Sequence, residues 1–411
     1  MIAKTAGCGS RMLQTNGSRL RGAFQGLGNN SGRAWIQLKR QECRNQRFDT
    51  AVFLFSSCIL NSVTLARLFS MGLGCASYAA PSLSKYTYLT SHRQISHALT
   101  RTKDTVAPCN MTAIVVSSSP SLISLGGIGA IYKLNACIVV KIPRYKDDPD
   151  HATEQSIFDI LESHPPHPNL VTSFLRVPNA TFLEFLPGGD LASRLWAQQR
   201  RDPKTQQVLA VSNQQLPKLR LRWMKELSAA AAWLEEIGLA HGDIRPSNVL
   251  FDSDDHVKLS DFDRSIKVGE HLDSGTEPFA RLLDEEGGQD RGTYGKAGPR
   301  TEQFALGSVI YSLVRGYDPY EDKWFGKDHG PILIDKFQKM KFPPLSGSTL
   351  DIVIQKCWYG QFATIKQLYE AMDSHGGWCE ETKVKSTELI MERRANCEEI
   401  IKNEVLKTFK M

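Results

Sequence analysis

Residues 241–263 read His241-Gly-Asp-Ile-Arg-Pro-Ser-Asn-Val-Leu-Phe-Asp-Ser-Asp-Asp-His-Val-Lys-Leu-Ser-Asp-Phe-Asp263. Within this stretch two short apolar runs, Val249 to Phe251 and Val257 to Leu259, flank a turn formed by residues 252–255. Short β-rich runs separated by Asp and Ser are typical of a β-hairpin. The rest of the fold is inferred outward from this hairpin.

Oxygen-bearing side chains stand at both ends of the predicted hairpin. Asp243 and Asn248 precede the first strand, and Asp261 follows the second. Because a hairpin brings its two ends together, we expect these three side chains to lie close to one another. Magnesium prefers hard oxygen ligands and is usually held by one or two carboxylates together with substrate phosphates. The stretch therefore predicts a magnesium site.

This pattern resembles the protein-kinase catalytic loop followed by the Asp-Phe-Gly motif, with His241-Gly242-Asp243 in the place of His-Arg-Asp and Asp261-Phe262-Asp263 in the place of Asp-Phe-Gly. The resemblance implies that Asp243 orients, or takes the proton of, an attacking hydroxyl. It also implies that Asn248 and Asp261 hold magnesium against the triphosphate of ATP. Arg245 stands where the family usually has Lys, and its planar fork suits the oxygens of the transferring phosphoryl group.

A glycine cluster lies between β-rich runs near the start of the ordered part of the chain, which we place at about Ser121. Gly126, Gly127 and Gly129 would let the backbone of a hairpin approach phosphates, because no Cβ intervenes. The cluster resembles the glycine-rich loop of the kinases, with Ser124 at the first glycine position. An ordinary glycine turn is the alternative reading of such a cluster.

Lys141 is the one charged residue in the apolar strand Ile138 to Ile142, where an unpaired ammonium group would be costly. Glu154 follows thirteen residues later, on the same helical face as Ile157 and Phe158. One alternative is an exposed Lys at the edge of a strand and a solvated Glu. We favour an ion pair, which resembles the kinase lysine–glutamate pair that holds the α and β phosphates.

Residues 181–191 form an apolar strand that leads into Pro-Gly-Gly-Asp-Leu, a sequence typical of a domain boundary. The stretch resembles the segment that joins the two kinase lobes. The resemblance places Leu183 where it limits the depth of the adenine pocket, and it assigns Glu184 and Leu186 to the segment whose backbone binds the adenine edge.

The rest of the chain after the glycine cluster alternates helical patterns with long polar segments. We expect a surface loop over 198–217, an alanine-rich helix over 219–237 and an almost entirely apolar central helix over 301–314. Residues 264–300 have no sustained periodicity and occupy the place of a kinase activation segment. Shorter helices are expected over 350–358 and 362–372, and a charged helix over 386–409.

Several features depart from the kinase pattern. Gly242 replaces the arginine that pairs with a phosphorylated activation loop, so we expect activity that does not require such phosphorylation. Asp263 replaces a glycine, which costs backbone freedom and adds a charge near the metal. No Ala-Pro-Glu precedes the central helix, where Gly298-Pro299-Arg300 stands nearby and Glu302 takes the place of the family's aspartate. The arginine partner of that missing glutamate is also absent.

The composition, with 41% hydrophobic and 23% charged residues among 411, is ordinary for a soluble globular protein. Residues 1–110 hold 14 Lys and Arg against 3 Asp and Glu, so the remainder is mildly acidic although the whole chain carries +6. This balance gives no sign of nucleic-acid binding. The nine cysteines have neither metal-ligand nor disulfide spacing, which indicates a reduced, intracellular protein.

The first 110 residues have three alternative interpretations. Their Arg-rich, Ser-rich and acid-poor composition is that of a mitochondrial transit segment. The apolar run Ala51 to Ala66 is shorter than the roughly 20 residues that cross a bilayer, so a membrane association is not expected. We favour a low-complexity basic extension that is disordered or a mis-assigned start, and we expect a cytoplasmic protein.

Taken together, the sequence predicts an α+β, bilobal, protein-kinase-like fold. We expect a small N-lobe over 111–186 with an antiparallel sheet and one helix, a larger helical C-lobe over 187–375, and a charged C-terminal helix within 376–411 that packs on the domain. The resemblance implies an ATP- and Mg²⁺-dependent protein kinase, of Ser/Thr specificity because Arg245-Pro246-Ser247-Asn248 is similar to Lys-Pro-x-Asn. The alternatives are a pseudokinase that binds nucleotide or acts as a scaffold, and a small-molecule kinase. A protein substrate is the expected partner.

Overall fold

The computed structural model describes residues 120–126, 129–375 and 382–409. The expectations for residues 1–110 and for Gly127 therefore lie outside the described residues. Within the described part, no helix is long and apolar enough to cross a membrane.

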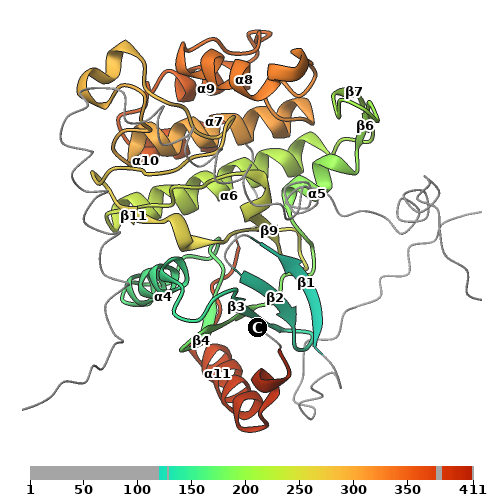
Figure 1. Ribbon diagram of the computed structural model, residues 1–411, viewed down its shortest axis with the longest axis vertical. Coiled ribbons are helices and arrows are strands. Elements are labelled where there is room, and N and C mark those ends of the chain that lie inside the picture. The colour runs from blue at the N-terminus through green and yellow to red at the C-terminus, as the bar shows by residue number, and fades with distance from the viewer. Residues whose placement is uncertain (1–119, 127–128, 376–381, 410–411) are drawn as a thin grey trace, which may run out of the picture. The chain divides into compact units, whose positions relative to one another are not determined.

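The small lobe is a five-stranded antiparallel sheet with one helix (Figure 1). The spatial order is β1-β2-β3-β5-β4, and helix α4 (Pro149–Glu162) lies between β3 and β4 in the chain. The side chain of Asp148 caps α4 by accepting hydrogen bonds from the amides of Asp150 and His151, which fixes where the helix begins. The strands are β1 (Ser121–Leu125), β2 (Gly129–Lys133), β3 (Ile138–Pro143), β4 (Ser173–Val177) and β5 (Ala180–Glu184).

The central strand β3 is buried on both faces, and its alternating residues enter two different cores. Val139, together with Leu183 of the neighbouring strand, joins the large core that continues into the other lobe. Ile138 and Val140 point the opposite way, into a second core that includes residues of the C-terminal helix. The sheet therefore needs apolar partners on both of its faces.

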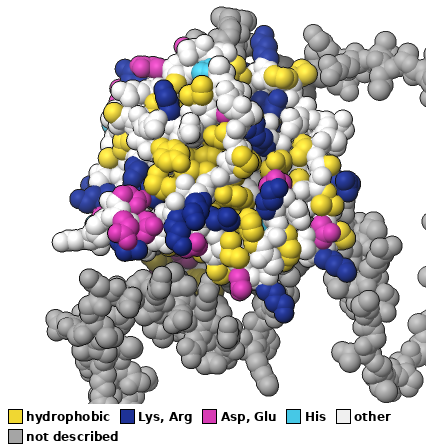
Figure 2. Space-filling model, turned by 90° about the horizontal axis from the view of Figure 1, so that it is seen from above, with side chains coloured by type: hydrophobic (Ala, Val, Ile, Leu, Met, Phe, Trp, Pro, Cys, Tyr) yellow, Lys and Arg dark blue, Asp and Glu magenta, His cyan; other side chains and the backbone are white. Residues whose placement is uncertain are grey.

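The large lobe is helical and packs around α7 (Pro299–Arg315), which is buried from Glu302 to Leu313. Gly316 ends this helix with φ 82°, a left-handed conformation that suits glycine. The predicted central helix over 301–314 thus lies where the sequence places it. The other helices of this lobe are α5 (Leu191–Trp196), α6 (Pro217–Glu236), α8 (His329–Gln338), α9 (Thr349–Trp358) and α10 (Ile365–Asp373). Figure 2 looks onto the molecule from above, where hydrophobic side chains gather between separate basic and acidic groups.

Several elements differ from the expectation. Residues 198–217 hold a small hairpin instead of only a loop, formed by β6 (Gln199–Arg201) and β7 (Val208–Val211). Arg201 anchors it through an ion pair of 2.8 Å with Glu321, a residue 120 positions away that local pattern could not reveal. Helix α8 was not foreseen.

The helix expected over 386–409 is also shorter than the pattern indicates. Helix α11 (Thr387–Lys402) ends before a left-handed Glu404 with φ 56°, and a separate helical turn, η5 (Val405–Thr408), follows. The apolar spacing continues through this break because the turn packs on the same core of the small lobe as α11. The bilobal α+β arrangement itself is confirmed.

Candidate active site

The predicted hairpin is present with the strands that the sequence indicates. Strands β9 (Val249–Phe251) and β10 (Val257–Leu259) are antiparallel, with Val249 opposite Leu259. The turn is closed by Asp252, whose carboxylate accepts hydrogen bonds from the amides of Asp254 and His256 at 3.0 and 2.9 Å. This local bonding explains why Asp is found at the first turn position.

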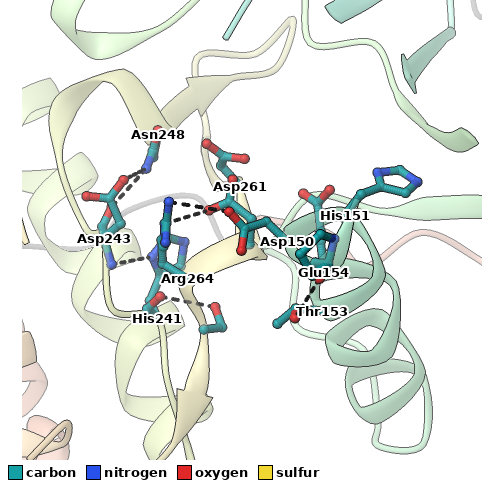
Figure 3. Close-up of polar contacts among 12 residues, drawn as sticks. Asp150, His151, Thr153, Glu154, His241, Asp243, Asn248, Asp261 and Arg264 are labelled. Carbon is teal, nitrogen blue, oxygen red and sulfur yellow. Dashed lines mark hydrogen bonds and ion pairs between the residues drawn. The ribbon is translucent and has the colours of Figure 1, made fainter. Parts of the chain in front are cut away.

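The loop before β9 arranges three of the expected site residues (Figure 3). Asp243 Oδ2 accepts hydrogen bonds from Arg245 Nε at 2.9 Å and from Asn248 Nδ2 at 3.0 Å. Asn248 Nδ2 also donates to the carbonyl of Asp243 at 2.8 Å. The amide nitrogen of Asn248 is thus occupied within the loop, and its oxygen Oδ1, whose one described donor is the 3.4 Å hydroxyl of Ser247, remains available to a cation.

Lys141 reaches from the small lobe to the carboxylates of three residues. Its Nζ lies 2.9 Å from Glu154 Oε1 and 2.6 Å from Asp261 Oδ1. Asp263, which stands in place of the family's glycine, lies 3.9 Å away. The side chains of Lys141 and Glu154 are 7% and 1% exposed, whereas that of Asp261 is 35% exposed. The structure therefore brings together Lys141, Glu154 and Asp261, as the resemblance implies, and adds Asp263.

This arrangement shifts the pKa values of all four groups. Burial by itself would lower the pKa of Lys141, but the three carboxylates outweigh it and raise that pKa well above its usual value. Burial raises the pKa of Glu154. For Asp261 the attraction of Lys141 outweighs burial, so its pKa is lowered. Burial and the neighbouring Asp261 raise the pKa of Asp263 to about 8. Lys141 and Asp261 are thus both charged at neutral pH.

The backbone at Asp261 is left-handed, with φ 71° and ψ 71°, an uncommon conformation for a residue other than glycine. The next side chain, Phe262, lies between two rings, with centroids 5.4 Å from Phe158 of α4 and 5.2 Å from His241. This packing keeps Asp261 turned toward Lys141. Arg264 Nη2 lies 3.5 Å from Asp150 Oδ2 and connects the same segment to the start of α4 (Figure 3).

Glu302 supports the catalytic loop from α7. Its carboxylate accepts hydrogen bonds from the amides of His241 at 2.8 Å and Gly242 at 3.3 Å. Burial raises the pKa of Glu302 to about 7, although both amide hydrogen bonds act in the opposite direction. By sequence, Glu302 stands where the family has aspartate. Its side chain, one methylene longer than that of aspartate, reaches the amides of His241 and Gly242 while α7 stays continuous.

The backbone conformation and the close packing at position 242 both require glycine. Its φ is 78°, and a Cβ at this position would lie 2.5 Å from the carbonyl oxygen of Arg264. The activation segment therefore passes closer to the loop than an arginine at 242 would permit. The expected backbone cost at Asp263 is absent, because Asp263 lies in the helical turn η2 (Phe262–Arg264) without a positive φ.

The start of α7 shows what replaces the missing Ala-Pro-Glu. Arg300, partly buried, donates a hydrogen bond to the carbonyl of Tyr294. Burial lowers the pKa of Arg300 to about 10. Arg300 is thus held by a backbone carbonyl, and among the described residues it has no carboxylate within ion-pair distance.

The segment between the lobes contains Leu183, Glu184 and Leu186, which are all buried. The amide of Phe185 donates to the carbonyl of Cys137 at 2.9 Å. Among the described residues the amide of Leu186 has no hydrogen-bond acceptor. The Glu184 carboxylate accepts from the amide of Thr172 at 2.7 Å and from Lys385 Nζ at 2.5 Å. Lys385 is a partner that sequence reasoning missed.

At the glycine cluster, the amide of Gly126 donates to the carbonyl of Gly129 at 2.8 Å and closes the turn between β1 and β2. A Cβ at Gly129 would lie 2.5 Å from the carbonyl oxygen of Ile142, so this close approach of two strands requires glycine. Strand β2, which follows the turn, pairs with β3 so that Ile131 is opposite Lys141.

The donors at this site fit magnesium only together with substrate phosphates. No cluster of three or more His, Cys, Asp or Glu side chains in the described part of the chain could hold a metal by itself. Asn248 Oδ1 and the carboxylate of Asp261 would supply two hard oxygen donors, and magnesium usually takes one or two carboxylates from a protein when phosphates supply the others.

Comparison with known proteins places this geometry in a family. Residues 130–368 match the sequence model described as "Protein tyrosine and serine/threonine kinase", which is more than half of the chain. The matched range includes Lys141, the hairpin and α7.

Individual relatives are more distant. The chain is 27% identical over 144 residues to the mouse receptor tyrosine-protein kinase erbB-2, and 27% identical over 180 residues to the maternal embryonic leucine zipper kinase of Xenopus tropicalis. It is also 27% identical over 205 residues to the human citron Rho-interacting kinase. These matches cover 34%, 41% and 47% of the chain but only 11%, 23% and 9% of the relatives.

Proposed function

Because the chain belongs to the family of protein tyrosine and serine/threonine kinases, we propose that it transfers the γ-phosphoryl group of Mg-ATP to a Ser or Thr hydroxyl of a protein substrate. The observation that carries this proposal is the position of Lys141, 2.9 Å from Glu154 and 2.6 Å from Asp261. A cation from one lobe and a carboxylate from the other meet where nucleotide phosphates would bind.

In this proposal Lys141 holds the α and β phosphates, and Glu154 keeps the ammonium group in position. Asn248 and Asp261 would hold magnesium, which when bound neutralises charge on the phosphate oxygens. The glycine-rich turn with Gly126, Gly127 and Gly129 would cover the phosphates, because no Cβ prevents a close approach of its backbone. These roles ask the protein for positioning and charge neutralisation, which supply most of the catalysis in phosphoryl transfer.

Asp243 is the residue proposed to orient the attacking hydroxyl and accept its proton. Its Oδ2 accepts hydrogen bonds from Arg245 and Asn248, which fixes the direction of the carboxylate. Arg245 is 34% exposed and has further N–H donors beyond the one that it gives to Asp243. These donors support a role for Arg245 at the oxygens of the transferring phosphoryl group.

The adenine ring would bind at the segment between the lobes. The amide of Leu186, which lacks an acceptor among the described residues, would donate to the ring edge. Leu183 would limit how deeply the ring enters. The backbone direction at Glu184 would depend on its carboxylate contacts, which anchor it on both sides.

The test is a transfer assay on the full chain with labelled ATP, magnesium, and two matched peptide libraries that offer Ser/Thr or Tyr as the acceptor. We expect transfer to the Ser/Thr library and a loss of about 100-fold or more in Asp243→Ala. Transfer to the Tyr library instead would show that the proposed Ser/Thr specificity is wrong. Binding of ATP with no transfer to either library would identify a pseudokinase instead.

A further inference from the structure

The C-terminal segment of the described structure, residues 382–409, contacts both lobes in succession. It begins beside the large lobe, where Thr382 Oγ1 lies 3.1 Å from Asn169 Nδ2, 3.2 Å from Glu226 Oε1 and 3.0 Å from His256 Nδ1. Asn169 and His256 are themselves buried. Thr382 is thus fixed to a polar network between α6 and the hairpin.

Three residues later the segment reaches the connection between the lobes. Lys385 Nζ lies 2.5 Å from Glu184 Oε2, and the Glu184 side chain is only 5% exposed. The other oxygen of Glu184 accepts from the amide of Thr172. Burying a carboxylate is costly unless a cation or several hydrogen-bond donors are paired with it.

A second lysine lies close to this pair but cannot replace Lys385. Lys258 is 3% exposed and donates from Nζ to the carbonyl of Pro168. Burial lowers the pKa of Lys258, the nearby Glu184 opposes that shift, and Lys385 adds to it. Because the ammonium group of Lys258 donates to Pro168 whereas that of Lys385 lies against the Glu184 carboxylate, Lys385 is the cation paired with Glu184.

Helix α11 then covers the outer face of the small-lobe sheet (Figure 1). Cys397 and Ile400 are fully buried in the same core as Val140 and Phe182. Arg394 Nε donates to the carbonyl of Phe174 in β4 at 2.9 Å. The segment is thus held at both ends, with Lys385 between them.

We propose that residues 382–409 form a strap that fixes the connection between the lobes from outside, and that Lys385 is a positioning residue for the nucleotide through Glu184. This inference rests on the proposed function, because it assigns the adenine ring to the segment Leu183–Leu186. Lys385 does not touch the nucleotide. It holds Glu184, two residues before Leu186, whose amide has no hydrogen-bond acceptor among the described residues.

The test compares three full-length variants. Lys385→Met removes the charge but keeps the length, Lys385→Arg restores a cation, and Lys383→Met is the matched control. Lys383 is exposed and makes no hydrogen bond or ion pair within the described residues. The KM for ATP and kcat are measured at a saturating concentration of the acceptor peptide, and the exchange of the Phe185 and Leu186 amides is followed by hydrogen–deuterium exchange.

For Lys385→Met we expect a rise of about fivefold in the KM for ATP with kcat unchanged within about twofold, which is the pattern of lost binding energy common to ground and transition states. Amide exchange at Phe185 should become faster. Lys385→Arg should restore both values, and Lys383→Met should change neither. If Lys385→Met and Lys383→Met have the same KM for ATP and the same amide exchange at Phe185 and Leu186, the proposal of a strap is wrong.

Amide exchange separates this proposal from the proposed function. If the unaltered chain neither binds ATP nor transfers phosphate, the proposed function fails, and exchange at Phe185 still decides whether Lys385 fixes the connection. If the chain is active and Lys385→Arg does not restore KM, the contact is only structural and the positioning role is rejected.

Discussion

The large lobe closes its core around α7 with helices that all lie between residues 191 and 373, whereas the outer core of the small lobe is completed by α11, more than 200 residues after β5 in the chain. Figure 1 shows α11 against the sheet, at the opposite end of the described structure from α8 and α9. The comparison indicates that the small lobe, which supplies Lys141, depends on a distant segment in a way that the large lobe does not.

The largest effect should follow from a charge placed in the outer core of the small lobe, which α11 completes. Ile400→Asp puts a carboxylate at a fully buried position, so we expect the free energy of unfolding to fall by about 3 kcal/mol or more. Urea unfolding of the full chain measures this. Met391→Asp lies on the same helix at a position 65% exposed and should change stability by no more than about 0.5 kcal/mol. Equal losses in both variants would mean that α11 is not part of the small-lobe core.

The next effect concerns the ion pair between β3 and α4. Lys141→Met leaves Glu154 buried without its cation, which should cost about 3 kcal/mol of stability. Adding Glu154→Met should recover most of that loss, because replacing both partners by apolar groups of similar volume is often neutral. Chemical unfolding of the two single variants and the double variant tests the coupling. Additive losses would show that the two side chains do not depend on each other.

The third prediction concerns Glu302 inside the large lobe. Its pKa is about 7 in the folded state against 4.5 in the unfolded chain. Between these values the folded state retains a proton that the unfolded state has lost, so stability should fall as pH rises through this window and level off above it. The shift corresponds to at most about 3 kcal/mol. Glu302→Gln should flatten this dependence in thermal unfolding measured from pH 5 to 8, whereas the exposed Glu236→Gln should leave it unchanged. If the stability of Glu302→Gln still falls as pH rises, Glu302 is not the group that causes the pH dependence.

The smallest effect is expected in the activation segment. Gly242 offers no arginine for a phosphate, and the segment is already held by hydrogen bonds such as the one from the Leu272 amide to the Gly295 carbonyl at 2.9 Å. Thr276→Ala and Thr293→Ala should therefore change transfer activity by less than about twofold. Phosphosite mapping of the purified chain accompanies the assay. A large loss of activity in either variant, with a phosphate mapped to that residue, would refute the prediction.

Local pattern was enough to predict the parts of the site that lie close together in the sequence. The hairpin follows from two apolar runs around Asp252, and the Lys141–Glu154 pair follows from one charge in an apolar strand and another on an apolar helical face. The order of these elements along the chain predicted the family and the bilobal fold. Asp261 at 2.6 Å from Lys141 came from resemblance, because 120 residues separate the two.

The sequence did not reveal contacts between two residues that each look ordinary among their own sequence neighbours. Lys385 looks like one of many charged residues before a charged helix, and Glu184 looks like a polar end to a strand. Only the fold brings their side chains together across 201 positions. Likewise, the lack of room for a Cβ at Gly242 is due to the carbonyl of Arg264, which lies 22 positions later in the chain.

The most direct test of the central claim is isothermal titration calorimetry of ATP binding to the full chain, with and without magnesium, for the natural sequence and for Asp261→Asn. We predict that magnesium strengthens ATP binding to the natural chain by about tenfold or more, and that Asp261→Asn loses this gain while still binding ATP without magnesium. An ATP affinity of the natural chain that does not depend on magnesium, or the same gain in Asp261→Asn, would contradict a nucleotide site formed by Lys141 and Asp261.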